Sequence, residues 1–269
     1  MEYETITVER DGAVMTVRMD RPERRNAINR QMHTELQDVC RRLDDDFAAR
    51  VVMITGTGRA FSSGAELGSR RESAPINDID RRARTSVGGK TSAMIEGLEQ
   101  VTIAAVNGLA IGGAVVFLSC CDMRIAAQSA WFSIPEVDLD LPLTWQALPR
   151  LMRELGPART KELVMACDRF TAQQALQWGF LNHVYPDAEV MAQTRKLAAR
   201  LLSMDPLSLA MTKTACNAIQ NTMVPIETTW SDRELMLLAY RQAALRLRGT
   251  QPADAGSKKP AKKSTTDRR

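Results

Sequence analysis

Residues 104–136, AAVNGLAIGGAVVFLSCCDMRIAAQSAWFSIPE, contain the residue types whose spacing could support chemistry. Gly112 and Gly113 stand at the start of an apolar helical stretch, and Glu136 follows about twenty residues after its first turn. A glycine turn at a helix start leaves backbone N–H groups free, and the helix dipole reinforces their positive charge. Such donors stabilise a developing oxyanion, while a nearby carboxylate transfers protons. The stretch therefore predicts acid/base chemistry on a substrate whose negative charge develops on oxygen.

Length and composition predict a globular protein with an uneven charge distribution. The chain has 269 residues, of which 44% are apolar and 25% charged, enough for one large domain or one domain with an appendage. Its net charge is +4, but residues 256–269 hold six of the 36 basic residues and one of the 32 acidic ones. The rest has 30 basic and 31 acidic residues and a net charge of −1. Because the basic tail carries no aromatic residues for base stacking, we do not expect a nucleic-acid partner.

Cysteine and histidine usage argues against disulfides and metal sites. The five cysteines are odd in number and have no C-x-x-C spacing, which favours a reducing compartment. The two histidines, His33 and His183, lie far apart, so we expect no metal site. The polar N-terminus is no signal peptide, and no apolar run approaches the roughly 20 residues that span a bilayer. We therefore expect a soluble, cytoplasmic protein without membrane insertion.

The pattern along the chain predicts an α/β core followed by helices. A hairpin is expected for residues 6–8 and 14–19, with its turn at Asp11 and Gly12. Residues 55–67 read as a glycine-rich loop, and the polar residues 68–90 as a mobile surface segment. Further strands are expected at residues 51–55, 102–105, 123–126 and 131–133. Helices are expected at residues 32–47, 91–98, 113–121, 151–155, 158–165, 172–178, 188–204, 208–221 and 229–247.

Six sequence blocks in order resemble the crotonase superfamily, the enoyl-CoA hydratase/isomerase family. They are RPERRNAIN at 21–29, AFSSGAEL at 60–67, AAVNGLAIGGA at 104–114, CD at 121–122, FSIPEV at 132–137 and RLMRELGPARTKELVMACDRFTAQQALQWGFLNHVYP at 150–186. The resemblance covers about residues 5–245. It implies an α/β fold: a spiral core of repeated ββα units in residues 1–200, and a C-terminal helical trimerisation region in residues 201–250. Residues 251–269, rich in Lys, Pro, Ser and Thr, are expected to form a disordered basic tail.

The same resemblance implies an acyl-CoA substrate whose thioester carbonyl is polarised by two backbone N–H groups. Matching the loops assigns these donors to Ala65 and Gly113, and a donor of this kind is typically worth about 3–4 kcal/mol of barrier. Backbone around residues 62–67 would hold the adenine, and basic residues after the hairpin would approach the phosphates. The residues assigned to coenzyme A or acyl binding are Arg24, Arg25, Ser62, Ser63, Gly64, Glu66, Leu67, Gly112, Val116 and Trp145. Coenzyme A belongs to the substrate, so no separate cofactor is expected, and the protein is expected to be a homotrimer or a hexamer.

The catalytic carboxylates depart from the pattern of hydratases in this superfamily. Those enzymes carry two glutamates, one in the first turn after the double glycine and one after the later proline. Glu136 matches the second, but Val116 stands at the place of the first. Moving a double bond needs only one base, which takes a proton from C2 and returns one at C4, so isomerisation is favoured. Hydroxycinnamoyl-CoA hydratase-lyases rely chiefly on the position of Glu136, so water addition stays open, as does a catalytically weak acyl-CoA-binding protein.

The segment after Glu136 leaves two further questions. If it is extended, Asp138 and Asp140 share the face of Glu136 and either could supply a second carboxylate. The alternative is that both are ordinary loop residues before Pro142. Dienoyl-CoA isomerases place another acid eight residues after the glutamate, where this chain has Thr144. The bulky Leu143 and Trp145 are expected to narrow or reshape the acyl pocket, although Trp145 is equally consistent with a core residue.

Overall fold

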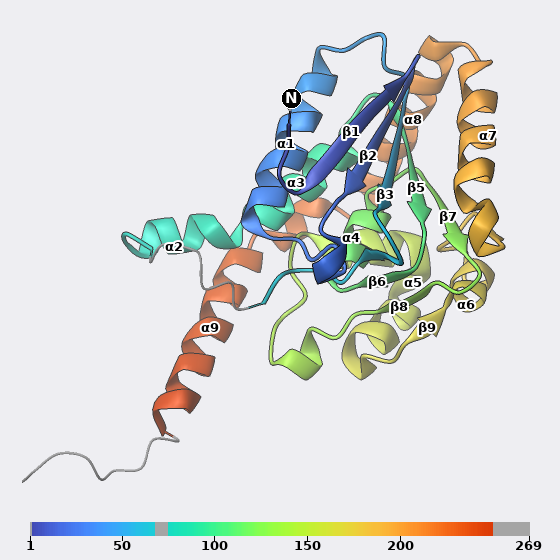
Figure 1. Ribbon diagram of the computed structural model, residues 1–269. Helices are drawn as coiled ribbons and strands as arrows, with labels where there is room; N and C mark the ends of the chain where they lie inside the picture. Colours follow the sequence, from blue (N-terminus) through green and yellow to red (C-terminus); the bar gives the residue numbers. More distant parts are fainter. Residues whose placement is uncertain (1, 68–74, 250–269) are drawn as a thin grey trace, which may run out of the picture.

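Two sheets form the centre of the computed structural model, which describes residues 2–67 and 75–249. The larger has the strand order β1-β2-β3-β5-β7-β10, and only the β1–β2 hairpin is antiparallel. The smaller has the order β4-β6-β8-β9 and is parallel except at β9 (Figure 1). The strands are β1 Ile6–Asp11, β2 Val14–Met19, β3 Val51–Gly56, β4 Ala60–Ser62, β5 Val101–Val106, β6 Leu109–Ile111, β7 Met123–Ala127, β8 Trp131–Ser133, β9 Phe170–Thr171 and β10 His183–Tyr185.

Helices cover the sheets and dominate the C-terminal part of the chain. They are α1 Arg30–Asp44, α2 Asp78–Thr85, α3 Val87–Glu96, α4 Gly113–Ser119, α5 Ala147–Ala166, α6 Ala172–Gln177, α7 Val190–Leu202, α8 Pro206–Met223 and α9 Asp232–Gly249. Short 3-10 helices occur at Pro22–Arg24, Val137–Leu139, Asp187–Glu189 and Ile226–Thr229. The repeated step from a strand of the large sheet to one of the small sheet and then to a helix matches the predicted ββα units. The elements that lie beyond Leu202 are helical, as predicted.

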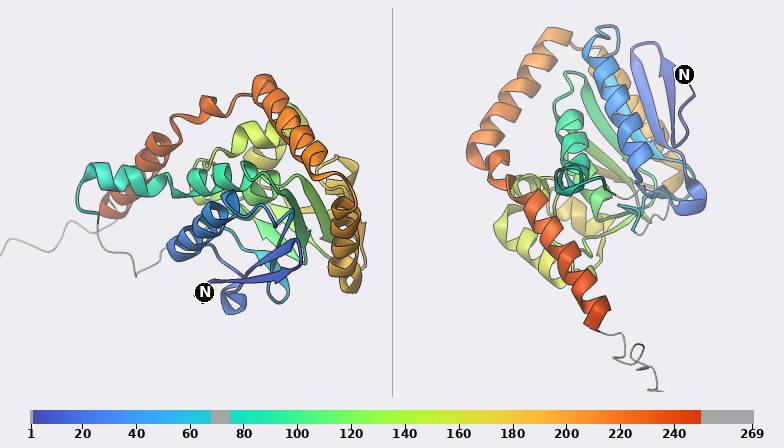
Figure 2. Two further views of the ribbon diagram at one scale, coloured as in Figure 1. Left: turned by 90° about the horizontal axis from the view of Figure 1, so that it is seen from above. Right: turned by 90° about the vertical axis from the view of Figure 1, so that its left-hand side faces the viewer.

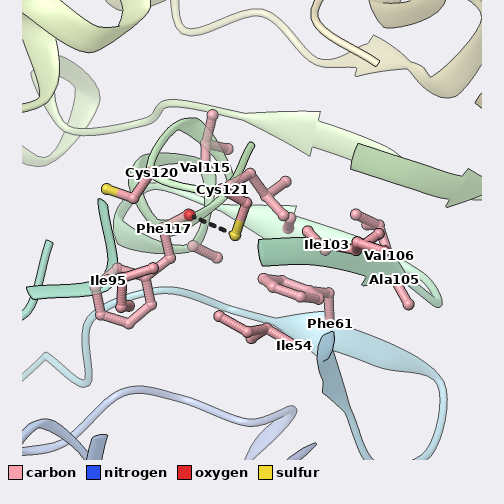
Figure 3. Packing of buried hydrophobic residues seen from close by; sticks show 14 of the residues in the cluster. Ile54, Phe61, Ile95, Ile103, Ala105, Val106, Val115, Phe117, Cys120 and Cys121 are labelled. Carbon is pink, nitrogen blue, oxygen red and sulfur yellow. Dashed lines mark hydrogen bonds between the residues drawn. The ribbon is translucent and has the colours of Figure 1, made fainter. Parts of the chain in front are cut away.

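Helix α4 lies inside the hydrophobic core, and every one of its residues is buried. Phe117 projects from α4 among side chains that include Ile95, and the adjacent strands contribute Ile54 and Ile103 (Figure 3). The Cys121 thiol donates to the Phe117 carbonyl over 3.4 Å, a contact drawn dashed in that view. A helix that is apolar on all sides is stable only inside a core. The packing therefore fixes the helix start, and with it the double-glycine turn.

The loop that follows the hairpin is tied to β4 by a buried asparagine. Asn26 of the RPERRNAIN block is 0% exposed, and its amide nitrogen donates to the carbonyls of Thr57, Ala60 and Phe61 at 2.8–3.2 Å. Its side-chain oxygen accepts from the Arg21 N–H over 3.0 Å. Satisfying this many polar groups inside the protein makes the junction specific. The start of the AFSSGAEL block is thereby held against residues 21–29.

The C-terminal helices differ in how closely they join the body. α5 breaks at Gly156, whose φ of +72° and ψ of 164° are non-helical, which confirms the two helical segments predicted there. Figures 1 and 2 show α9 running away from the sheets with α2 beside it, and the two helices are in contact. Arg82 of α2 pairs with Glu234 of α9 over 2.5 Å. No residue of the 18-residue α8 is buried.

The predicted surface position of residues 68–90 is confirmed for residues 78–85, none of which is buried, but the described part of this segment is helical. Residues 78–85 form α2 and α3 begins at Val87. Asn77 caps α2 by accepting the Asp80 N–H, and Arg84 pairs with Asp80 over 2.7 Å at i,i+4 spacing. Capping, helical ion pairs and contact with α9 together stabilise a sequence that is polar enough to resemble a loop.

Some predicted segments lie outside the described residues, and others differ from the structure in their boundaries. Residues 68–74 and the predicted disordered tail, residues 251–269, lie outside the described residues. Helix α1 begins two residues earlier than predicted, because Asn29 caps it by accepting the Met32 N–H over 2.8 Å. The glycine-rich loop over residues 55–67 contains the short strand β4. Among the described helices, none is both long and apolar enough to cross a membrane.

Candidate active site

A cavity of about 600 Å³ opens where the double-glycine turn, the AFSSGAEL loop and the segment after β8 meet. Its walls contain most of the residues that the sequence singles out. Those residues are Ser63, Gly64, Ala65, Glu66, Leu67, Gly112, Gly113, Val116, Glu136, Leu143, Thr144 and Trp145. Helices α2 and α9 complete the rim with Arg81, Arg84, Met236 and Tyr240. The cavity is therefore lined by residues that lie far apart in the sequence, from position 28 to position 240.

Ala65 and Gly113, which carry the two expected backbone donors, both line this cavity. Ile28 donates to the Gly64 carbonyl over 2.8 Å and accepts from the Glu66 N–H over 2.9 Å, so the Ala65 N–H between them turns away from Ile28. Gly113 is the first residue of α4 and its N–H has no acceptor within the helix. Gly64 has a φ of +82°, and a Cβ there would lie 3.3 Å from the Gly113 nitrogen. The two turns are thus in direct contact.

Glu136 brings one carboxylate against the double-glycine turn. A Cβ on Gly112 would lie 2.6 Å from Glu136 Oε1, so the carboxylate rests directly on this glycine. Its Oε2 is buried and has no hydrogen-bond partner among the described residues. Burial without a partner disfavours the ionised form and raises the pKa of Glu136 to about 7. A carboxyl group with this pKa both accepts and releases protons near neutral pH.

Trp145 packs on the other half of the same turn. A Cβ on Gly113 would lie 2.3 Å from its ring, and a Cβ on Gly88 of α3 would lie 2.2 Å from it. Trp145 and Gln146 both have a left-handed backbone, with φ of +64° and +60°. The Gln146 N–H donates to Asp232 of α9 over 2.8 Å, which helps to hold this unfavourable conformation. Trp145 therefore both lines the cavity and packs against α3 and α4.

The hypothesis of a second carboxylate after Glu136 is wrong in its geometry. The backbone that follows Glu136 is not extended but forms the 3-10 helix Val137–Leu139, and Asp140 has a φ of +58°. The Leu141 N–H donates back to the Glu136 carbonyl over 2.9 Å, which closes the turn. Asp138 and Asp140 are exposed and neither lines the cavity. The turn separates both residues from the face of Glu136.

The remaining polar residues predicted to bind coenzyme A lie at or beside the cavity. Ser62 is fully buried, and its hydroxyl donates to the Asn26 carbonyl over 2.7 Å and accepts from the Gly64 N–H over 3.1 Å. It shapes the loop and does not line the cavity. Arg24 and Arg25 are exposed outside the cavity wall, but their carbonyls accept from the side chain and backbone of the neighbouring Ser63. Both arginines therefore flank the entrance.

Several cavity residues were missed by the sequence reasoning. Arg30, the first residue of α1, lines the cavity and forms no ion pair with any described residue. His33, one turn further along α1, lies in the cavity wall although it is only 3% exposed. Arg81 and Arg84 belong to the segment that the sequence analysis assigned to the surface. The available signal was the helical spacing of Arg30 and His33, which places both on one side of α1.

Comparison with known proteins shows the family to which the chain belongs. The family model described as enoyl-CoA hydratase/isomerase matches residues 9–250. The chain belongs to the enoyl-CoA hydratase/isomerase family. It is 34% identical over 218 residues to the crotonyl-CoA hydratase of Syntrophomonas wolfei, covering 81% of this chain and 83% of that relative. It is also 34% identical over 222 residues to the mitochondrial Delta(3,5)-Delta(2,4)-dienoyl-CoA isomerase of Rattus norvegicus, covering 78% and 68% of the two chains.

Solved structures support the same placement and confirm the predicted fold class. An enoyl-CoA hydratase/isomerase from Xanthobacter autotrophicus Py2 superposes with a TM-score of 0.81 at 27% identity, covering 94% of this family member and all of that chain. An enoyl-CoA hydratase from Bacillus anthracis gives 0.75 at 29% identity, covering 91% and 94%. The fold is thus the crotonase fold. As a member of this family, the protein is an enoyl-CoA hydratase or isomerase.

Replacing Gly112 by alanine is expected to disrupt the site through steric conflict with Glu136. Its φ of +53° already disfavours a side chain, and the added Cβ would lie 2.6 Å from Oε1. We expect kcat/KM for an enoyl-CoA substrate to fall about 10²-fold, because misplacing a reacting group by about 1 Å costs that much.

The matched control is Gly179→Ala. Gly179 has a φ of +80°, and nothing lies within 4 Å of its would-be Cβ. This control should lose about 1–2 kcal/mol of folding stability from backbone strain alone and keep kcat/KM within about twofold. Equal losses of kcat/KM in both variants would show that strain, and not contact with Glu136, determines the effect.

Proposed function

We propose that this enzyme moves the double bond of an unsaturated acyl-CoA thioester, with Glu136 as its single acid/base. The substrate is a 3-enoyl-CoA and the product a 2-enoyl-CoA. The buried Glu136 carboxyl without a partner, resting on Gly112 inside the cavity, is the observation that carries this proposal. The apolar Val116, 1% exposed in the same cavity, supplies no second acid. One proton-transfer group is what isomerisation requires.

The reaction proceeds through an enolate in two proton transfers. The ionised Glu136 removes a proton from C2, and the electron pair of that C–H bond moves through the carbonyl carbon onto the thioester oxygen. The N–H groups of Ala65 and Gly113 donate to this oxyanion, which lowers the barrier of the step. The carboxyl group of Glu136 then returns the proton to C4 as the thioester carbonyl reforms. The double bond has moved from C3–C4 to C2–C3 with no net change in composition.

Arginines at the rim provide a means of binding the coenzyme A part of the substrate. Arg30 lines the cavity and forms no ion pair within 4.0 Å with any described residue, and Arg24 and Arg25 flank Ser63 nearby. We assign the phosphates to this group of arginines and the adenine to the backbone of residues 62–67, because guanidinium groups suit phosphate recognition. Coenzyme A enters as part of the substrate, so the reaction as proposed needs no further cofactor.

Water addition is the second candidate because relatives carry that activity in their names. The short-chain-enoyl-CoA hydratase of Clostridium acetobutylicum is 32% identical over 218 residues, like the crotonyl-CoA hydratase already described. Here Glu136 would have to activate water and also deliver the proton to C2. The turn that separates Asp138 and Asp140 from Glu136 leaves those residues without a part in this route.

We also propose that copies of this chain assemble through the C-terminal helices into a trimer or a dimer of trimers. Helix α8 has no buried residue, and its exposed apolar side chains include Leu207, Met211, Ile219 and Met223. Large apolar patches of this kind mark interfaces. A second copy of the chain is the occupant that matches the oligomers implied by the family resemblance.

Glu136→Gln is expected to abolish isomerisation while leaving the cavity shape intact. Because the amide cannot take the C2 proton, turnover of a 3-enoyl-CoA should fall about 10²–10⁴-fold. Product analysis by liquid chromatography, which separates the two enoyl-CoA isomers of equal mass, should show 2-enoyl-CoA formed from 3-enoyl-CoA and no 3-hydroxyacyl-CoA formed from 2-enoyl-CoA in the unmodified enzyme.

Asp138→Asn is the matched control, since it removes an exposed carboxylate two residues away, and it should retain activity within about twofold. Formation of 3-hydroxyacyl-CoA from 2-enoyl-CoA by the unmodified enzyme would show that the reaction is hydration and not isomerisation. Turnover of 3-enoyl-CoA by Glu136→Gln at the unmodified rate would refute the single-base mechanism. Binding of acyl-CoA without turnover in the unmodified protein would identify a binding protein instead.

Activity should depend on pH through the ionisation of Glu136. Proton removal requires the carboxylate, and burial has raised the pKa of this group to about 7. We expect kcat/KM to rise tenfold per pH unit below the midpoint and to level off above it. Initial rates from pH 5 to 9 measure the profile. A midpoint near 4.5, the ordinary value for a glutamate, would contradict the role of burial.

Light scattering at several protein concentrations tests the assembly. We expect a mass of three or six times 29.8 kDa for the unmodified chain. Replacing both Met211 and Ile219 by aspartate should shift the protein toward monomers, because charges are costly in an apolar interface. A monomer at all concentrations would rule out the proposed assembly. Replacing the exposed Met165 of α5 by aspartate serves as a control, because it adds a charge outside α8, and should leave the mass unchanged.

A further inference from the structure

His33 is a buried histidine in the wall of the cavity that the proposed reaction does not use. Its side chain extends from α1, is 3% exposed and lines the cavity. The imidazole stands edge-on to Trp145, with ring centroids 4.8 Å apart, and 5.9 Å from the ring of Phe117. The aromatic packing fixes the orientation of the ring.

A hydrogen-bond chain assigns the proton on the ring. His33 Nδ1 lies 2.9 Å from the hydroxyl oxygen of Thr91. That hydroxyl donates to the Val87 carbonyl over 3.0 Å and accepts from Gln37 Nε2 over 2.9 Å. Since the single hydroxyl proton is given to Val87, the imidazole donates from Nδ1 and Nε2 keeps its lone pair.

The environment also keeps the ring neutral. Burial lowers the pKa of His33 to about 3, and the positive charge of Arg30 acts in the same direction. The ring is therefore uncharged throughout the physiological pH range, and Nε2 is an acceptor. No described residue is hydrogen-bonded to Nε2. An acceptor in a largely apolar cavity that lacks a partner favours a ligand that brings a donor.

His33 lies close to the proposed position of the thioester. The Trp145 ring is in contact with His33, and it occupies the space that a Cβ on Gly113 would need. His33 and Gly113 line the same cavity, so an acyl chain that extends from the proposed oxyanion site shares this cavity with the imidazole.

We propose that His33 determines substrate specificity by accepting, through Nε2, a hydrogen bond from a hydroxyl group on the acyl chain. The preferred substrates are then hydroxylated acyl-CoA thioesters, a class that plain aliphatic hydratase or isomerase activity does not specify. This inference rests on the proposed acyl-CoA function. It assigns His33 to substrate binding, separate from the proton transfers of Glu136.

Binding of unreactive thioesters tests the inference without turnover. Dissociation constants would be measured by calorimetry, on the full chain, for hexanoyl-CoA and for hexanoyl-CoA with a hydroxyl on its fourth, fifth or sixth carbon. At least one hydroxylated isomer should bind about 10- to 100-fold more tightly than hexanoyl-CoA, the range expected when a buried polar group is otherwise left unpaired.

Two variants identify the group responsible. His33→Asn retains an amide near the position of Nδ1, where it can still reach Thr91, but removes Nε2; the preference for the hydroxylated isomer should fall below about threefold. His183→Asn replaces the other histidine of the chain, which is exposed on β10, and should leave the preference unchanged. Circular dichroism and thermal unfolding establish that both variants are folded.

Each remaining outcome is decisive. Equal binding of all four thioesters would overturn the role of His33 and leave the proposed function intact, whereas no binding of any of them would overturn the proposed function itself. A preference that persists in His33→Asn would assign the selectivity to another residue. Tighter binding of an oxo analogue than of the matching hydroxyl compound would show that Nε2 donates, and would refute the inference.

Discussion

The site depends on a turn that has no room for a side chain. A Cβ on Gly112 would lie 2.6 Å from the Glu136 carboxylate, and a Cβ on Gly113 would lie 2.3 Å from the Trp145 ring. Gly112 also needs a φ of +53°, which side chains rarely adopt. The two glycines therefore allow a carboxylate and an indole to approach the start of one helix together. Gly113 begins that helix and lines the cavity.

Much of the remaining fold holds the partners of this turn in place. The Gly112 N–H donates to the Ser133 carbonyl over 2.9 Å, which ties the turn to β8 three residues before Glu136. On the other side, the buried Arg150 donates to the carbonyl of Gln146 over 2.9 Å and pairs with Glu96 of α3 over 2.5 Å. This ion pair anchors the left-handed backbone at residues 145–146. Strand β8 and helices α3 and α5 thus hold the double-glycine turn and the backbone at residues 145–146 in place.

The sequence predicted the local features of this site and missed those that depend on helix contacts. A double glycine before an apolar stretch and a glutamate after a proline are readable because each works through its own backbone and immediate neighbours. The ordered blocks then assigned the loop of Gly64 and Ala65 to the same site as the double glycine, and the structure places Gly64 beside the backbone of Gly113. Asp138 and Asp140 stayed open between a second carboxylate and ordinary loop residues, because the sequence does not show whether the backbone is extended; the 3-10 turn that forms there agrees with the loop alternative. His33 was missed because its helical spacing with Arg30 indicates a shared side of α1 but does not show that this side meets Thr91 on α3.

Burial in the cavity shifts the pKa values of Glu136 and His33 in opposite directions, which suits the two residues to different roles in the proposed function. Burial disfavours charge, so it raises the pKa of Glu136 to about 7 and lowers that of His33 to about 3. Near neutral pH, Glu136 exists in both protonation states and exchanges protons, while the neutral His33 offers only a lone pair. Val116 belongs to the same logic: an apolar side chain adds no charge and no hydrogen bond that would counter the desolvation of Glu136. With an apolar residue at position 116, burial alone raises the pKa of Glu136, and proton transfer in the proposed reaction falls to this one carboxyl group.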